Sequence, residues 1–139
     1  MKTTLSPYLN FAGNAREAME FYKSILGGEL VMQTFSESGQ SKSPADKDRI
    51  MHVELRNGAL SFMASDANSQ GNPVKMGDNI HMSLMGSDEA TLRKYFAGLS
   101  AGGTVQFPLA KQFWGDIYGQ LTDKFGVHWM VNIGSEPQK

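Results

Sequence analysis

The stretch PYLNFAGNAREAMEFYKSILGG, residues 7–28, contains a strand pattern, a turn and a helix pattern in immediate succession. Residues 7–11 form a short, partly aromatic segment that is soon followed by Gly13, which is typical of a strand that ends in a turn. Over residues 15–26 the apolar side chains recur at spacings of three and four, which predicts a helix with one buried face. This is the strongest helix signal in the chain.

The sequence also marks where helices begin and end. Asn14 is expected to cap the first helix, with Glu17 completing a capping box, and Gly27-Gly28 is expected to end it. Ser87 is expected to cap a second helix, which Gly102-Gly103 would end. The apolar positions that share one face of this second helix are Leu92, Tyr95, Phe96 and Leu99.

The remaining elements read as strands and loops. Strands are predicted over residues 29–35, 49–55, 59–65, 80–85, 104–109, 118–122 and 128–133. Residues 36–47 are rich in Ser, Gly, Lys and Asp and predict an exposed loop. Asn57-Gly58 predicts a tight hairpin turn, because both residues favour positive φ angles.

A shift of 75 residues superposes the two halves of the sequence at equivalent points. It places Gly27-Gly28 on Gly102-Gly103, Phe21 on Phe96, Leu30 on Val105 and Leu9 on Leu84. We therefore predict an α+β fold of two βαβββ modules in one domain over 1–139. The first module covers about 1–66, a polar linker about 67–78, and the second module about 79–139.

Composition limits the possible functions. The chain has 139 residues, 40% of them hydrophobic and 19% charged, with a net charge of −1. A near-neutral chain gives no reason to expect nucleic acid or an anionic membrane as a partner. There is no cysteine, which excludes disulfides, thiolate metal sites and a cysteine nucleophile. No signal-peptide core or membrane-spanning stretch is recognised, so we expect a cytoplasmic protein.

Two segments carry a resemblance to a known family. SPYLNFAGNAREAMEFY, residues 6–22, and FWGDIYGQLTDKFGVHWMVN, residues 113–132, resemble the PhnB-like group of the vicinal oxygen chelate superfamily. That superfamily includes glyoxalase I, bleomycin and fosfomycin resistance proteins and extradiol dioxygenases. The resemblance implies two open, curved sheets completed by homodimerisation, with a ligand cavity inside each curve.

The resemblance also allows a check of the metal site. Metal-using relatives place one ligand each on the first, fourth, fifth and eighth strands. The corresponding positions here are Pro7, Met63, His81 and Met130. Only His81 offers a suitable donor, and a divalent ion needs several donors that converge. We therefore expect no cofactor, and a divalent metal only through His81 together with His52 or Glu54, should these turn inward.

Several residues are candidates for ligand binding. His81 is expected on the cavity side, because Ile80, Met82 and Leu84 would form the helix-packing face. Trp114 and Tyr118 are suited to stacking on a planar ligand that Asp116 would orient, or they cover the sheet end or a dimer seam. The cavity lining is completed by Ser83, Met63, His128 and Met130. Trp129 is expected to pack on the opposite face.

These observations support two main hypotheses. The first is a protein of the bleomycin-resistance type that binds a small apolar or aromatic molecule in an adaptable, methionine-rich cavity without a complete metal site. The second is a metal-dependent lyase, transferase or dioxygenase that uses His81. A third is a scaffold whose role is interaction or assembly. Whether the chain is an enzyme stays open at this point.

Overall fold

The computed structural model describes residues 3–39, 47–67 and 74–134. Its contacts divide the chain into two compact units, Met1–Lys75 and Met76–Lys139. The boundary falls within the predicted linker, of which residues 68–73 lie outside the described residues. The single domain over 1–139 stays a prediction.

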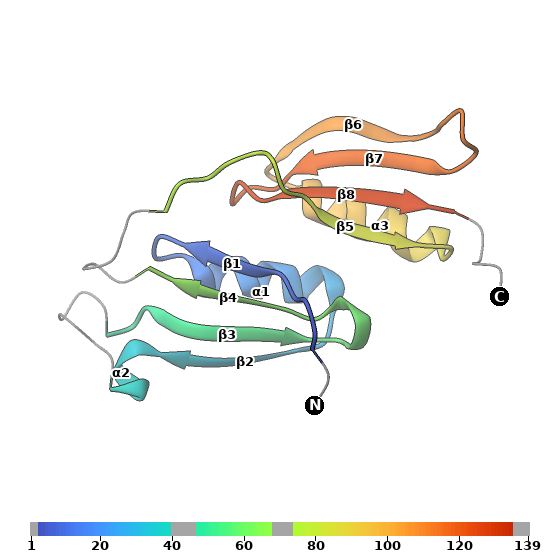
Figure 1. The fold of residues 1–139 in the computed structure, drawn as a ribbon. Coiled ribbons are helices and arrows are strands. Elements are labelled where there is room, and N and C mark those ends of the chain that lie inside the picture. Colours follow the sequence, from blue (N-terminus) through green and yellow to red (C-terminus); the bar gives the residue numbers. More distant parts are fainter. Residues whose placement is uncertain (1–2, 40–46, 68–73, 135–139) are drawn as a thin grey trace. The chain divides into compact units, whose positions relative to one another are not determined.

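The two units contain equivalent elements in the same order (Figure 1). The elements of the first unit are β1 (Tyr8–Phe11), α1 (Ala15–Leu26), β2 (Glu29–Thr34), α2 (Phe35–Ser38), β3 (Ile50–Arg56), the 3-10 turn η2 (Gly58–Leu60) and β4 (Phe62–Asp66). Those of the second unit are β5 (Met82–Gly86), α3 (Glu89–Ser100), β6 (Thr104–Lys111), β7 (Ile117–Thr122) and β8 (His128–Ile133). The predicted βαβββ order is confirmed in both units.

Each unit forms an open four-stranded sheet with the same topology. The strand order is β1-β4-β3-β2 in the first sheet and β5-β8-β7-β6 in the second. The first and last strands of each unit pair in parallel, with Tyr8 beside Met63 in one sheet and Ser83 beside Met130 in the other. The other pairs are antiparallel. The structure thus confirms the α+β class with two unclosed sheets.

One helix covers one face of each sheet, α1 in the first unit and α3 in the second (Figure 1). The buried side chains of α1 are Ala15, Ala18, Met19, Tyr22 and Leu26, and those of α3 are Leu92, Phe96 and Leu99. They pack against alternate strand residues such as Val53, Leu55, Leu121 and Val131, which are all fully buried. Burying each large apolar side chain contributes about 1.5–3 kcal/mol. The interface between helix and sheet is therefore the main source of stability within each unit.

The repeated double glycines have a steric reason. Gly27 and Gly102 adopt positive φ angles of 80° and 77°, which glycine tolerates best. A Cβ on Gly28 would lie 2.4 Å from the carbonyl oxygen of Arg56, and one on Gly103 would lie 2.2 Å from that of Thr122. In each unit the chain leaving the helix passes so close to a neighbouring strand that only glycine fits.

The structure corrects the predicted starts of both helices. The Asn14 side chain makes no capping bond, so neither the predicted cap nor its capping box with Glu17 forms. Instead Oδ1 of Asp66 accepts hydrogen bonds from the backbone N–H of Gly13 and Ala15, at 3.0 and 2.8 Å. Asp66 is distant in sequence, and the β1–β4 pairing brings it to the helix start.

The second helix begins one residue later than expected. Asp88, not Ser87, caps α3, and its side chain accepts a hydrogen bond from the backbone N–H of Thr91. Its other carboxylate oxygen accepts from the Thr91 hydroxyl at 2.8 Å. Aspartate and serine are comparable caps, so the sequence alone did not separate them.

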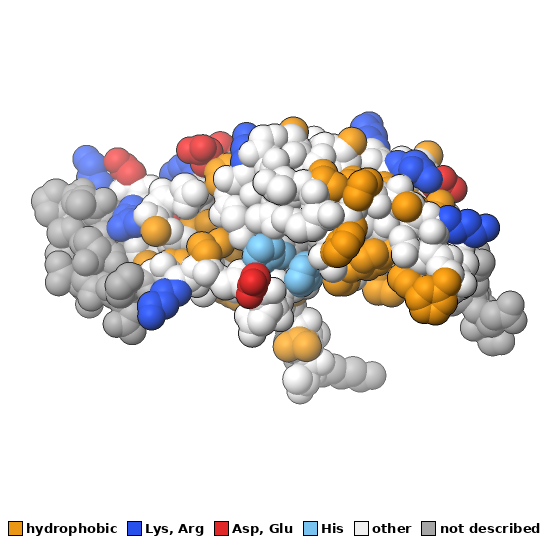
Figure 2. All heavy atoms as spheres, turned by 90° about the horizontal axis from the view of Figure 1, so that it is seen from above, with side chains coloured by type: hydrophobic (Ala, Val, Ile, Leu, Met, Phe, Trp, Pro, Cys, Tyr) orange, Lys and Arg blue, Asp and Glu red, His pale blue; other side chains and the backbone are white. Residues whose placement is uncertain are grey.

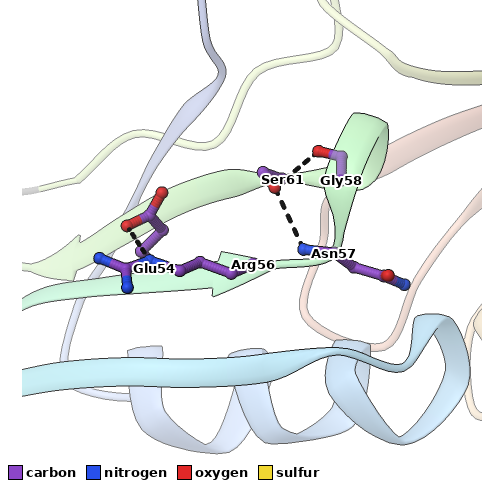
Figure 3. A network of polar contacts seen from close by, with 5 residues as sticks. All are labelled: Glu54, Arg56, Asn57, Gly58 and Ser61. Carbon is purple, nitrogen blue, oxygen red and sulfur yellow. Dashed lines mark hydrogen bonds and ion pairs between the residues drawn. The ribbon is translucent and has the colours of Figure 1, made fainter.

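Two further corrections concern the loops of the first unit. The predicted exposed loop over 36–47 begins as the short helix α2, closed by a capping box between Thr34 and Glu37. Residues 40–46 of that loop lie outside the described residues. The expected tight turn at Asn57-Gly58 is also wrong, because Asn57 has a φ of −154° and a 3-10 turn follows it. Ser61 closes this loop, accepting from the Asn57 N–H and donating to the Gly58 carbonyl (Figure 3).

Candidate functional site

Several of the predicted site residues lie on the sheet face opposite the helix. On β8, Trp129, Val131 and Ile133 are buried toward the helix, and the residues between them are partly exposed on the open face. The open face of the second unit is formed by Ser83, Met85, Tyr118, Gln120, Thr122, His128, Met130 and Asn132. The strand alternation thus places Ser83, Tyr118, His128 and Met130, all predicted cavity residues, on one surface.

His81 and His128 lie next to each other at one end of this face. Their ring centroids are 5.4 Å apart. Figure 2 shows histidine side chains gathered on the surface beside an acidic one. His81 precedes β5, which begins at Met82, and Ile80 is 75% exposed, so the prediction that Ile80 packs toward the helix is wrong. The predicted candidate His81 therefore has the imidazole of His128 as a ring neighbour.

Both ring nitrogens of His128 have hydrogen-bond partners. Nε2 donates to the carbonyl oxygen of Gly77 at 2.9 Å, which fixes the tautomer and leaves Nδ1 to accept from the Thr122 hydroxyl at 2.8 Å. Gln106 in turn donates to the Thr122 oxygen at 3.0 Å. This chain of bonds fastens the segment before β5 to the sheet, so His128 could ligate a metal only by breaking one of them.

An aromatic cluster lies where β6 connects to β7. The Trp114 ring stands edge-on to Phe113 at 5.0 Å between centroids, and it lies 6.1 Å from the Tyr118 ring. Phe113 is 97% exposed and Trp114 50% exposed. The Tyr118 hydroxyl accepts a hydrogen bond from Gln120. The structure thus brings the two predicted stacking residues, Trp114 and Tyr118, into contact with each other.

Asp116 lies against the end of β8. Asn132 Nδ2 donates to Asp116 Oδ2 at 2.9 Å, and the Asp116 backbone oxygen accepts from the N–H of Gln112. A Cβ on Gly134 would lie 3.0 Å from both Asp116 carboxylate oxygens. These contacts fasten the β6–β7 connection to β8. The expected role of Asp116 in orienting a ligand stays a prediction.

The second tryptophan has a structural role, as predicted. Trp129 is 1% exposed, and its indole N–H donates to Oδ2 of buried Asp123 at 2.8 Å. Asp123 Oδ1 also accepts from the backbone N–H groups of Phe125 and Val127. The carboxylate therefore satisfies the polar groups of the last hairpin, and Trp129 belongs to the core rather than to the site.

The open face of the first unit carries two residues that the sequence analysis considered only as metal ligands that would have to turn inward. His52 and Glu54 alternate with buried Val53 and Leu55, so both face the open side. Nδ1 of His52 is hydrogen-bonded to the Tyr8 hydroxyl at 3.0 Å. Period-two alternation within MHVEL could have placed His52 on this face, but nothing in the sequence linked it to Tyr8.

The donor set of this unit does not fit a divalent metal. Tyr8, not Pro7, pairs with Met63, and Leu9 and Phe11, which share the parity of Pro7, are turned toward the helix. Glu54 accepts from Arg56 Nε at 2.9 Å (Figure 3). In the described part of the chain, no three His, Asp or Glu side chains are arranged to hold a metal ion. The positions occupied by Met63 and Met130 supply thioethers, which are poor ligands for hard divalent ions.

A pocket of about 390 Å³ lies in the first unit. Its lining residues are Val31, Met32, Gln33, Glu37 and His52. Three come from the edge strand β2, one from α2 and one from β3. Among them the sequence analysis named only His52, as a metal ligand that would have to turn inward. The five residues come from separate elements and form no recognisable motif.

No helix in the described ranges has the length and apolar character needed to cross a membrane. The cytoplasmic location stays a prediction.

Comparisons with known proteins identify the family. The family described as 3-demethylubiquinone-9 3-methyltransferase matches residues 3–132. Protein YjdN of Escherichia coli K12 is 31% identical, over 93% of this chain and 94% of its own. The crystal structure of protein PA1353 from Pseudomonas aeruginosa is similar with a TM-score of 0.82 and 42% identity, covering 95% of this chain and 98% of that one.

More distant structures share the fold. The PhnB protein from Bacillus cereus has a TM-score of 0.77 at 24% identity, covering 95% of this chain and all of that one. An enzyme of the glyoxalase/bleomycin resistance protein/dioxygenase family from Burkholderia phytofirmans has a TM-score of 0.60 at 16% identity, covering 91% and 95%. The match over residues 3–132 places the chain in the family described as 3-demethylubiquinone-9 3-methyltransferase, and its paired βαβββ units have the fold of the PhnB and glyoxalase/bleomycin resistance protein/dioxygenase structures.

Proposed function

We propose that this protein binds a small apolar or aromatic molecule on the open face of its second unit, and that it does so as a homodimer. The observation that carries the proposal is the exposed apolar surface there. Met85 is 71% exposed, and Phe107, Phe113 and Trp114 are also exposed. Large apolar side chains left exposed in number on one unit suit a binding or association site.

The polar groups on the same face suit orientation rather than acid–base chemistry. Gln120 and Tyr118 bond to each other, and both nitrogens of His128 are in use. A flat ligand would stack on Trp114 while Met85 and Met130 adapt to its outline. A partner copy would cover the remainder of the open face, which is the arrangement that the family resemblance implies.

The methyl transfer named in the family's description is not part of this proposal. A nucleoside cofactor is often held by the free N–H groups at a helix N-terminus that follows a strand. Here Asp66 occupies those groups at α1, and Asp88 bonds to Thr91 at α3. The metal-dependent alternative would rest on His81 alone, since the other predicted ligand positions lack suitable donors.

Calorimetric titration with 1-naphthol, a neutral planar probe, tests the binding proposal. We expect saturable binding that Trp114→Ala weakens at least ten-fold and that Leu5→Ala, the truncation of a fully exposed apolar residue in the first unit, leaves unchanged. Equal binding by the Trp114 and Leu5 variants, or none by the wild type, would overturn it.

Two further measurements test the homodimer and the metal-dependent alternative. Sedimentation equilibrium is expected to give twice the monomer mass, and a monomer at all concentrations would contradict the homodimer. Metal analysis of untagged protein distinguishes binding from metal-dependent catalysis. Stoichiometric metal that disappears in His81→Ala would favour the enzyme alternative.

A further inference from the structure

We propose that the pocket of the first unit binds a small organic cation, whose ammonium or amidinium group pairs with Glu37 and whose hydrocarbon part contacts Val31 and Met32. This site is separate from the open face of the second unit, and the inference does not rest on the function proposed above.

The pocket combines apolar and polar groups. Its volume of about 390 Å³ lies in the usual range for small-molecule sites. Val31 and Met32 supply an aliphatic and a thioether surface, and Gln33, Glu37 and His52 supply polar atoms. Glu37 is the only formally charged group among these five residues. A ligand that satisfies this carboxylate must bring a positive charge or strong hydrogen-bond donors.

Contacts outside the pocket hold its two main polar side chains in place. Glu37 Oε1 accepts from the N–H of Thr34 at 2.8 Å, and the Thr34 hydroxyl accepts from the N–H of Glu37 at 3.0 Å. The Tyr8 hydroxyl is bonded to Nδ1 of His52, and the two rings lie 5.7 Å apart. Side chains that are already ordered lose less entropy when a ligand binds, so the capping box and Tyr8 prepare the pocket.

The protonation state of Glu37 also favours a cation. Hydrogen bonds from the Thr34 backbone and side chain lower the pKa of Glu37 below its ordinary value of 4.5, and the charge of Arg16 contributes less. The carboxylate is therefore ionised at all ordinary pH values. Arg16 is the opposing influence, because its Nη1 lies 3.4 Å from the sulfur of Met32, at the pocket's lining.

NMR titration of the full chain with benzylammonium tests the proposal, with benzyl alcohol as the neutral probe of similar shape. We expect saturable shifts of residues 31–37 and of the His52 ring with the cation, and much weaker ones with the alcohol. Glu37→Gln removes the charge yet can keep the capping box, since glutamine also accepts at this position. It should weaken binding about three-fold to five-fold, as suits an exposed ion pair.

Two control variants sharpen the test. Glu20→Gln removes an exposed acid of α1 outside the pocket lining and should leave binding unchanged. Arg16→Gln should strengthen binding about two-fold, because it removes the competing cation. Equal shifts with benzyl alcohol, undiminished binding in Glu37→Gln, or shifts confined to the second unit would each overturn the proposal. If 1-naphthol did not bind through Trp114, the function proposed for the second unit would be wrong but the cation site of the first unit would be unaffected. The two proposals can therefore be tested separately.

Discussion

The two units share one topology but differ in the chemistry of their open faces. In the first unit the open face carries Tyr8, His52 and Glu54, which are tied into hydrogen bonds and an ion pair. In the second it carries Met85 and the Trp114–Tyr118 aromatic pair. The helix-covered faces are alike, since both are mostly apolar and in both units a glycine after the helix lies close to a strand carbonyl. The helix-covered faces thus stabilise the shared fold of the two units, and the open faces are free to differ.

A second contrast lies in the two buried carboxylates. Asp66 joins three parts of the first unit, accepting from Gly13, Ala15 and the N–H of Ile50. Asp123 acts within one hairpin of the second unit. The first unit therefore depends on a residue at its far end to start its helix, whereas the second helix is capped by the adjacent Asp88.

The largest effect is expected from removing the carboxylate at the start of α1. Asp66→Ala leaves three backbone N–H groups without their acceptor and should destabilise the protein by about 3–5 kcal/mol, measured by urea unfolding. Asn14→Ala is the control and should change stability by less than about 0.5 kcal/mol, because its side chain makes no capping bond. If Asn14→Ala cost as much as a lost cap, about 1 kcal/mol, the reassignment of this cap to Asp66 would be wrong.

The next largest loss of stability is expected at the glycines that follow each helix. Gly28→Ala and Gly103→Ala would each force a Cβ into a backbone carbonyl, and each should cost about 2–4 kcal/mol. Gly39→Ala is the matched control, with a φ of 78° but no atom within 4 Å, and should cost only about 1 kcal/mol. A loss in Gly28→Ala no larger than that in Gly39→Ala would show that φ alone, and not the close approach, requires glycine at position 28. Gly103 is not among the glycines with a positive φ, so its loss measures the close approach alone.

The two tryptophans should respond very differently to replacement by phenylalanine. Trp129→Phe removes the donor to Asp123 from the core and should destabilise by about 1–3 kcal/mol. Trp114→Phe changes a half-exposed ring and should stay within about 0.5 kcal/mol. Thermal unfolding followed by circular dichroism measures both, and equal losses would contradict the division into core and site.

The smallest effect concerns the capping carboxylates at low pH. Hydrogen bonds from Thr34 lower the pKa of Glu37, and hydrogen bonds from Thr91 lower that of Asp88. A depressed folded-state pKa means that each cap contributes fully above the unfolded values, 4.5 and 3.8, and is lost as the pH falls through the folded ones. Carboxyl NMR titration should show both groups titrating below those values, and a normal Glu37 titration would contradict its capping box.

Sequence patterns predicted the elements better than the contacts between their ends. Periodicity located α1 and β8 at the observed residues, and the shift of 75 identified the second unit. The cap at Asn14 and the turn at Asn57-Gly58 were wrong because distant partners decided them. Asp66 replaces Asn14 as the acceptor at the helix start, and the Asn57 amide donates instead to the carbonyl of Leu26, at 2.7 Å.

For the candidate sites too, local sequence patterns predicted some features and contacts between distant segments decided the others. Alternation along β8 placed His128 and Met130 on the open face, because side chains on a strand change sides at every residue. The pocket at Glu37 and His52 was not predicted, since it depends on α2 following an edge strand and on Tyr8 reaching across the sheet.

The sequence by itself determined the two βαβββ units, their helix-facing apolar stripes, the glycines between helix and strand, and the family. These follow from periodicity and from local backbone preferences, which act over a few residues. Only the tertiary structure decided which carboxylates cap the helices, that both nitrogens of His128 are occupied, and that Glu37 and His52 share a pocket. Those features depend on hydrogen bonds and packing between segments far apart in the chain, which local preferences do not encode.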